Sequence, residues 1–147
     1  MRFAASLPRQ VGGAEHHAAA KREEAFMSKR ILLADDDDDA RSGLATLLEG
    51  MGYDVAVAHS GPETLEVAAR FQPRVAIVAL DIPELNGTAA ARQLRAQSAG
   101  RPLLLIALTG WGQPHRHDPA LTAGFDVHLV KPVSIDQLNF ILSMTGN

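Results

Sequence analysis

Residues 31–39 read Ile-Leu-Leu-Ala-Asp-Asp-Asp-Asp-Asp, an apolar run that passes directly into five consecutive aspartates. A short apolar run bounded by polar residues is typical of a buried strand. The stretch 38–49 that follows is amphipathic and predicts a helix, whose dipole favours the acids in its first turn. A buried strand, an acidic loop and a helix therefore stand in direct succession, and this unit decides the fold class.

The same alternation of apolar runs and amphipathic stretches continues to the end of the chain. Strands are predicted over 31–34, 53–58, 75–80, 103–108 and 127–130, and helices over 38–49, 62–71, 88–97, 117–123 and 135–144. The last helix also has a capping-box pattern, with Ser134 as N-cap and Gln137 three residues later. Five successive βα units predict an α/β fold in which helices cover both faces of a doubly wound parallel sheet.

Composition narrows the class of protein. The chain has 147 residues, 46% of them hydrophobic and 21% charged, with a net charge of −3 and no cysteine. One domain with a single core fits this length. The modest charge gives no reason to expect direct binding to nucleic acid or to a membrane surface, and no apolar stretch approaches the roughly 20 residues that span a bilayer. The lack of cysteine suits a reducing compartment, so we expect a cytoplasmic protein.

The first 28 residues differ from the rest. They are rich in alanine and charge but lack a steady apolar stripe. We interpret 1–28 as a mobile N-terminal extension and 29–147 as the folded domain. Met27 stands just before the first strand and is a second candidate for the start of translation.

Polar residues follow the predicted strands at the edge where doubly wound sheets bind ligands. Asp35 and Asp36 follow the first strand, Asp81 the third, Thr109 the fourth and Lys131 the fifth. Carboxylate oxygens suit a divalent cation such as Mg²⁺, while a hydroxyl and an ammonium suit phosphoryl oxygens. The set predicts a site for a metal ion together with a phosphoryl group.

These motifs resemble those of response-regulator receiver domains, over roughly residues 29–146. The resemblance rests on the apolar strand followed by Asp35-Asp36, on Pro83 and Gly87, on Ala107-Leu108-Thr109-Gly110, and on Val130-Lys131-Pro132. It implies a flavodoxin-like sheet of order 2-1-3-4-5 with five helices. It also implies that Asp35 and Asp36 are metal ligands, that Thr109 is the switch hydroxyl, and that Lys131 contacts the phosphoryl group before a cis proline.

The chain departs from the family at the phosphate-accepting aspartate. The family places proline four residues and glycine eight residues after that aspartate, and counting back from Pro83 and Gly87 reaches Ala79. A methyl group cannot attack phosphorus or bind a metal, so this position accepts no phosphate. A shifted alignment would make Asp81 the acceptor, at the cost of deleting two loop residues.

Several roles stay open. Asp81 is a solvated loop acid, a weak metal ligand or a surrogate acceptor. Lys131 is either a phosphate sensor or the neutralising partner of the two neighbouring acids. His128 stands where the family often has an aromatic switch residue, and is either a titratable switch or an ordinary partly buried histidine.

The function expected from the resemblance is signal transduction in a two-component system or phosphorelay, without catalysis. Because Ala79 accepts no phosphate, we expect a pseudo-receiver that binds a histidine kinase, a phosphotransfer protein or another receiver independently of phosphorylation. Its first helix is the expected partner surface, and the face from the fourth helix to the fifth helix is the expected homodimer surface. Mg²⁺ binding is expected to be weakened.

Two alternatives remain. The chain is an ordinary phosphoreceiver if Ala79 was introduced in place of aspartate or if Asp81 accepts the phosphate. It would be a phosphatase of the haloacid-dehalogenase type if Asp35 and Asp37 formed that family's Asp-x-Asp motif. However, that motif wants Thr or Val where this chain has Asp39, and no cap insertion is recognisable.

Overall fold

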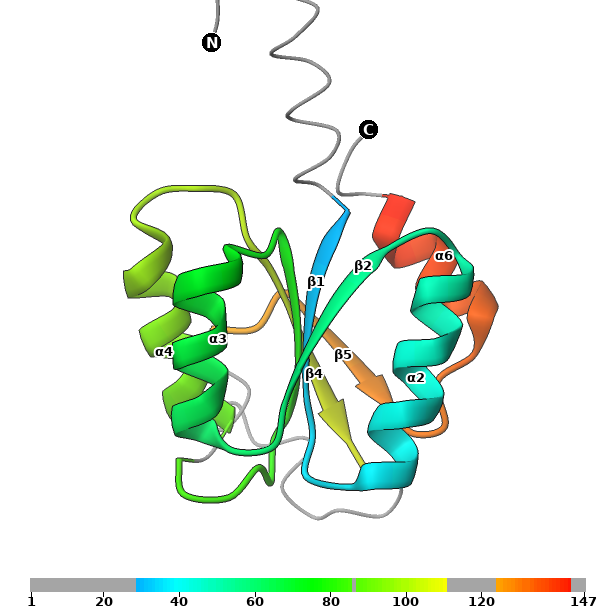
Figure 1. The fold of residues 1–147 in the computed structure, drawn as a ribbon, viewed down its shortest axis with the longest axis horizontal. Coiled ribbons are helices and arrows are strands. Elements are labelled where there is room, and N and C mark those ends of the chain that lie inside the picture. The colour runs from blue at the N-terminus through cyan, green and yellow to red at the C-terminus, as the bar shows by residue number, and fades with distance from the viewer. Residues whose placement is uncertain (1–28, 86, 111–123, 144–147) are drawn as a thin grey trace, which may run out of the picture.

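Five parallel strands form one sheet in the order β2-β1-β3-β4-β5. The structure is a computed structural model that describes residues 29–85, 87–110 and 124–143 (Figure 1). The strands are β1 (Arg30–Ala34), β2 (Asp54–Ala58), β3 (Val75–Ala79), β4 (Leu104–Thr109) and β5 (Val127–Val130). The predicted strand order is confirmed.

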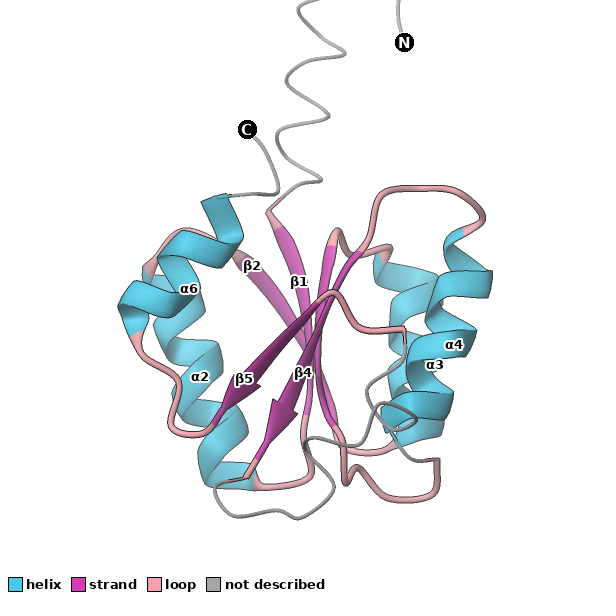
Figure 2. Cartoon of the chain, turned by 180° about the vertical axis from the view of Figure 1, so that it is seen from behind, coloured by secondary structure: helices cyan, strands magenta, loops and turns pink. Residues whose placement is uncertain are grey.

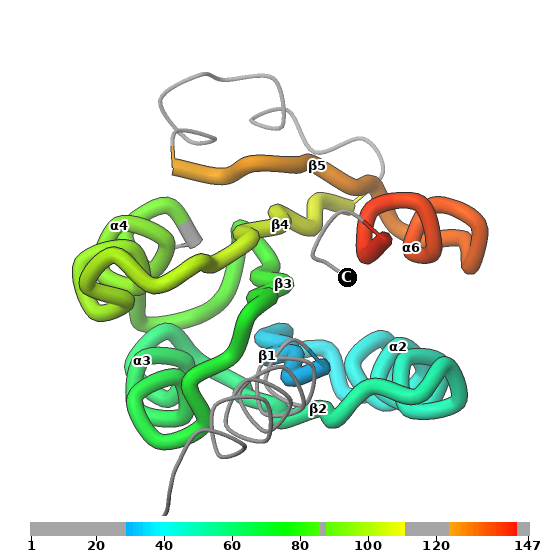
Figure 3. Tube along the Cα trace, turned by 90° about the horizontal axis from the view of Figure 1, so that it is seen from above, coloured from blue at the N-terminus to red at the C-terminus, as the bar shows by residue number. Residues whose placement is uncertain are grey.

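Helices cover both faces of the sheet. They are α2 (Asp38–Gly50), α3 (Gly61–Phe71), α4 (Gly87–Ser98) and α6 (Ile135–Leu142). Figures 2 and 3 show α2 and α6 against one face and α3 and α4 against the other. This is the arrangement of a flavodoxin-like fold.

The central strands are apolar along their whole length because both of their faces are buried. Every residue of β3 is fully buried, and so is every residue of β1 after Arg30. Alternate residues pack into two hydrophobic clusters, one on each face of the sheet, rather than into the single core expected from the length. Ile31 and Leu33 pack toward α2 and α6, while Leu32 and Ala34 pack toward α3.

The helix starts follow from local sequence. The Asp37 side chain accepts a hydrogen bond from the Ala40 N–H and caps α2. Ser60 caps α3 through the Glu63 N–H. The capping box of α6, predicted from Ser134, is present with both of its hydrogen bonds.

A close approach at Gly61 fixes the loop after β3. The Gly61 N–H donates to the Pro83 carbonyl at 3.0 Å. A Cβ atom on Gly61 would collide with the side chain and backbone of Leu85. The absence of a side chain at the start of α3 therefore lets the third βα loop pack against it.

Differences from the predicted bounds are small. The strand predicted over 103–108 covers 104–109 instead, because the Lys131 N–H extends the β4–β5 ladder to the Thr109 carbonyl. The strand predicted from 53 begins at 54. The helix predicted over 117–123 and the extension 1–28 lie outside the described residues. Within the described part of the chain, no helix is long and apolar enough to cross a membrane.

Candidate functional site

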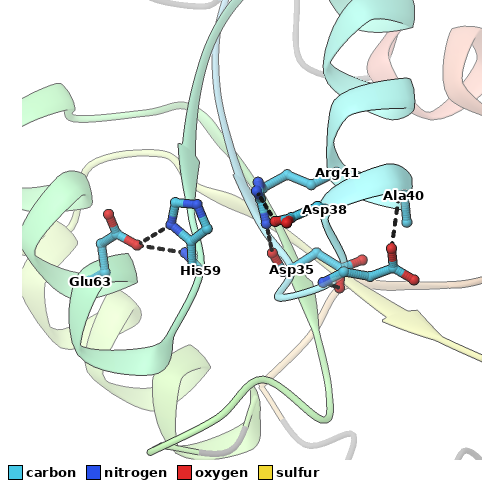
Figure 4. Close-up of polar contacts among 7 residues, drawn as sticks. Asp35, Asp38, Ala40, Arg41, His59 and Glu63 are labelled. Atoms are coloured by element: carbon cyan, nitrogen blue, oxygen red, sulfur yellow. Dashed lines mark hydrogen bonds and ion pairs between the residues drawn. The ribbon is translucent and has the colours of Figure 1, made fainter.

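Asp35 is the most constrained acid at the carboxyl edge of the sheet. Its side chain is 2% exposed. Its backbone N–H donates to the Ala58 carbonyl at 3.1 Å, and its Oδ1 accepts from the Asp37 N–H at 3.1 Å. The Asp35 carbonyl accepts from Arg41 Nη1 at 2.7 Å. These contacts hold the carboxylate in one position just beyond β1 (Figure 4).

Lys131 neutralises this buried carboxylate. Its Nζ lies 2.7 Å from Asp35 Oδ2, and its own side chain is 29% exposed. A buried carboxylate without a partner would be costly, so the ion pair compensates the burial of Asp35. Lys131 is positioned by the backbone, since its N–H donates to the Thr109 carbonyl and its peptide bond to Pro132 is cis. The structure thus brings together two of the residues singled out from the sequence.

Ala79 is the last residue of β3 and is fully buried. It pairs with Leu108 of β4, and the residue before it, Val78, pairs with Ala34 of β1. Continued by one residue past the end of β1, this register brings Ala79 to the level of Asp35. The Ala79 side chain belongs to the core on the side of α2 and α6. At this point the carboxyl edge of the sheet presents a methyl group rather than an oxygen ligand.

Arg41 is a site residue that the sequence analysis missed. It is a buried arginine of α2, and its Nη2 lies 2.6 Å from Asp38 Oδ1 while its Nη1 holds the Asp35 carbonyl. The hydrogen bond from Arg41, reinforced by its charge, lowers the pKa of the Asp38 carboxyl below its usual value. Its position three residues after Asp38, on the same helical face, was the available signal.

A second polar pair, also missed, lies beyond β2. His59 Nδ1 and the His59 backbone N–H both donate to Glu63 Oε1, at 2.7 and 2.6 Å. The hydrogen bonds from His59 lower the pKa of the Glu63 carboxyl below its usual value. Figure 4 shows this pair on the α3 side of the Asp35–Arg41 cluster. The i, i+4 spacing of His59 and Glu63 was the sequence signal.

The other predicted site residues differ in their environments. Asp36 and Asp81 are exposed, Asp81 two residues beyond the end of β3. Thr109 is buried, and its hydroxyl is 3.4 Å from the Leu129 carbonyl, at the limit of a hydrogen bond. His128 is exposed on β5, with its ring 6.2 Å from that of Phe125.

The donor set does not match a full Mg²⁺ site. Across the described residues, no group of three or more acidic, histidine or cysteine side chains is placed to hold a metal ion. Asp35 Oδ2 is engaged by Lys131, and Ala79 supplies no side-chain oxygen. Mg²⁺ prefers six oxygen ligands and keeps several waters, so a cation here would depend on Asp35, Asp36 and solvent.

A pocket of about 530 Å³ opens between α2 and the segment that joins β5 to α6. Asp35 and Lys131 lie at its polar end, together with Asp39. The remaining lining residues are apolar or glycine, namely Ala40, Gly43, Leu44, Leu47, Leu108, Pro132 and Val133. The arrangement suits contacts with a ligand or a partner side chain.

Comparison with known proteins identifies a family. The sequence profile described as "Response regulator receiver domain" matches residues 31–143. Response regulator MprA of Mycobacterium leprae is 37% identical over 98 residues, which cover 67% of this chain and 42% of that protein. The chain therefore spans less than half of the length of this curated relative.

Solved structures agree on the fold. The receiver domain of sensor histidine kinase PA1611 from Pseudomonas aeruginosa, solved with magnesium in its active-site cleft, is 29% identical with a TM-score of 0.68, over 78% of this chain and 94% of that one. The receiver domain of Saccharomyces cerevisiae Ssk1, solved with the phosphotransfer protein Ypd1, has a TM-score of 0.69 over 80% of this chain and 88% of that one. At 22% identity, the second likeness concerns the fold alone.

Proposed function

The chain belongs to the response regulator receiver domain family of two-component signalling, and from this premise we propose that it is a pseudo-receiver that signals without phosphorylation of residue 79. The observation that carries the proposal is the pair of Asp35 and Lys131 beside the buried methyl group of Ala79. The framework of a phosphoryl site is retained while its central carboxylate is missing.

Residue 79 lacks the nucleophile that phosphoryl transfer requires. To accept a phosphoryl group, a carboxylate oxygen must form a bond to phosphorus while the bond from phosphorus to the donor's leaving group breaks. The Ala79 methyl group has no lone pair for this attack. Asp81 is exposed and stands outside β3, two residues beyond the strand end. This placement favours the alignment on Ala79 over the one that makes Asp81 the acceptor.

In this proposal Lys131 has a structural role. In a phosphorylated receiver, the lysine ammonium would bind a phosphoryl oxygen. Here the Lys131 ammonium forms an ion pair with Asp35 Oδ2 at 2.7 Å instead. Asp35 and Asp36 would hold a divalent cation only weakly, because binding at Asp35 has to compete with Lys131. Thr109 and His128 have no phosphoryl group to respond to, and the proposal assigns them no switching role.

Partners are recognised by shape and charge in this account. The partner would dock on the surface of α2, which is the first helix predicted from the sequence, beside the acidic loop. It would be a histidine kinase, a phosphotransfer protein or another receiver. Self-association would use the face that includes β5 and α6, where Ile135 and Phe140 are 46% and 72% exposed. We propose that the protein is cytoplasmic, has no enzymatic activity and makes no direct contact with nucleic acid or membrane.

The test compares partner binding with and without a phosphoryl donor. The full chain would be measured against the purified histidine kinases and phosphotransfer proteins of its source organism, by surface plasmon resonance. We expect one partner whose affinity does not change when acetyl phosphate and Mg²⁺ are added, and falls at least about tenfold in the Leu44→Glu variant of α2. Binding that appears only with the phosphoryl donor would overturn the proposal. Binding that Leu44→Glu leaves unchanged would remove the α2 surface from it.

A further inference from the structure

We propose that the pocket between α2 and the β5–α6 segment is a binding site for a small organic cation, one with an apolar body and a single ammonium group. This inference does not depend on the proposed signalling role. It rests on three properties of the pocket, namely its hollow, its apolar walls and the sign of the charge at its polar end.

The hollow exists because α2 presents small residues toward it. Ala40 and Gly43 are one helical turn apart and both line the pocket. A Cβ atom built on Gly43 would meet no other atom within 4 Å. The volume of about 530 Å³ falls within the range of small-molecule sites. The space is therefore open where a larger side chain at either position would fill it.

The walls can bury an apolar body. Leu44 and Leu47 of α2 line one side, and Leu108 and Val133 come from the β4 end and the β5–α6 segment. Apolar lining with a small number of polar groups at one end is the usual composition of a ligand pocket. Removal of a ligand's apolar surface from water would supply most of the affinity.

The polar end favours a positive charge. Lys131 is already paired with Asp35 at 2.7 Å, so these two lining residues balance one another. Asp39 is the remaining charged lining residue, and the exposed Asp36 and Asp37 precede it in the same acidic loop. The lining therefore carries a net charge of about −1 at neutral pH, which attracts an ammonium and repels a carboxylate or phosphate.

The experiment uses three probes of similar size and different charge, namely 4-phenylbutylamine, 4-phenylbutyrate and 4-phenylbutanol. Each is titrated into the isotope-labelled full chain, and amide NMR shifts are followed at the pocket residues. We expect the amine to bind with a dissociation constant of about 1 mM or tighter, the range that ligands of this size reach. The carboxylate should bind at least about fivefold more weakly than the amine.

Variants locate the site. Gly43→Leu should fill the pocket and abolish binding, whereas Gly50→Leu, at another glycine of α2 with open space around it, should leave binding unchanged. Asp39→Asn should weaken binding of the amine about threefold and leave the alcohol unaffected. The NMR spectrum of each variant also reports whether it is folded.

Three results would overturn the inference. They are the absence of any shift at pocket residues with all three probes, tighter binding of the carboxylate than of the amine, and undiminished amine binding by a folded Gly43→Leu variant. Partner binding can fail without affecting this test, because the probes are measured against the isolated chain.

Discussion

Lys131 Nζ lies 2.7 Å from Asp35 Oδ2, and the Asp35 side chain is only 2% exposed. Burying a carboxylate this deeply is costly unless an opposite charge lies beside it. The ion pair links the residue that follows β1 to the residue that follows β5, at the edge of the sheet where β3 ends with the apolar Ala79. We regard this pair as the structural centre of the candidate site.

Removing the ammonium group of Lys131 should destabilise the fold. We expect Lys131→Met to lower the free energy of unfolding by about 2 kcal/mol, because it leaves Asp35 buried without a partner. Urea denaturation measures the change, with the exposed Lys29→Met as the matched control. The double variant with Asp35→Asn should recover part of the loss. Equal stability of Lys131→Met and the control would show that the pair contributes nothing.

Mg²⁺ affinity should depend on residue 79. Ala79→Asp adds a carboxylate beside Asp35 and should tighten Mg²⁺ binding about tenfold, equivalent to about 1.4 kcal/mol. Lys131→Met should also tighten it relative to the parent chain, because the cation then no longer competes with the ammonium at Asp35. Isothermal titration calorimetry measures both. Affinity that is the same in all three proteins would contradict the competition between Lys131 and the metal.

The hydrogen-bonded pair of His59 and Glu63 predicts that the free energy of unfolding depends on pH. Hydrogen bonds in the folded state lower the pKa of Glu63 from its ordinary value of 4.5. The ionised carboxylate therefore stabilises the folded state, and this contribution is fully present at pH values above 4.5. The contribution is lost as the pH falls through the lowered pKa. Glu63→Gln should cost about 0.3 to 0.5 kcal/mol at pH 6, because the pair is partly exposed to solvent, and progressively less as the pH is lowered below the ordinary pKa of 4.5. A difference between the two proteins that grows on acidification would have the wrong sign.

The loop after β3 depends on Gly61. We expect Gly61→Ala to lower the free energy of unfolding by about 1 to 3 kcal/mol, since the new methyl group collides with Leu85. Gly43→Ala is the control, because it adds a methyl group to a helix in open space and should stabilise by up to about 1 kcal/mol. Thermal unfolding of both variants checks this. Similar changes in the two variants would mean that the loop moves aside without cost.

The sequence predicted the fold because its signals are local. Apolar runs such as Ile31–Ala34, and caps such as Ser134, specify strands and helix starts through neighbouring residues alone. The position of Asp35 and Lys131 at the same edge follows from parallel strands. The sequence left two roles open for Lys131, and a direct contact with Asp35 was one of them. The contact could not be predicted with certainty because it depends on the length and direction of a flexible side chain.

Burial of the individual acids was harder to predict. Asp35 and Asp36 are adjacent and chemically identical, yet one is buried and the other exposed. Side chains of a strand alternate between its faces, so Asp35 continues the Ile31 and Leu33 side of β1 while Asp36 leaves it. The contacts of Arg41 with Asp35 and Asp38 were missed because we assigned the first-turn acids to the helix dipole alone.

Incubation with acetyl phosphate and Mg²⁺, followed by intact mass measurement, tests the central claim most directly. The account predicts no added phosphoryl group on this chain and one on Ala79→Asp, where a carboxylate oxygen can displace acetate from phosphorus. A gain in the variant would show that the rest of the site can still support phosphorylation. A phosphoryl group on Asp81 of the unaltered chain would contradict the account.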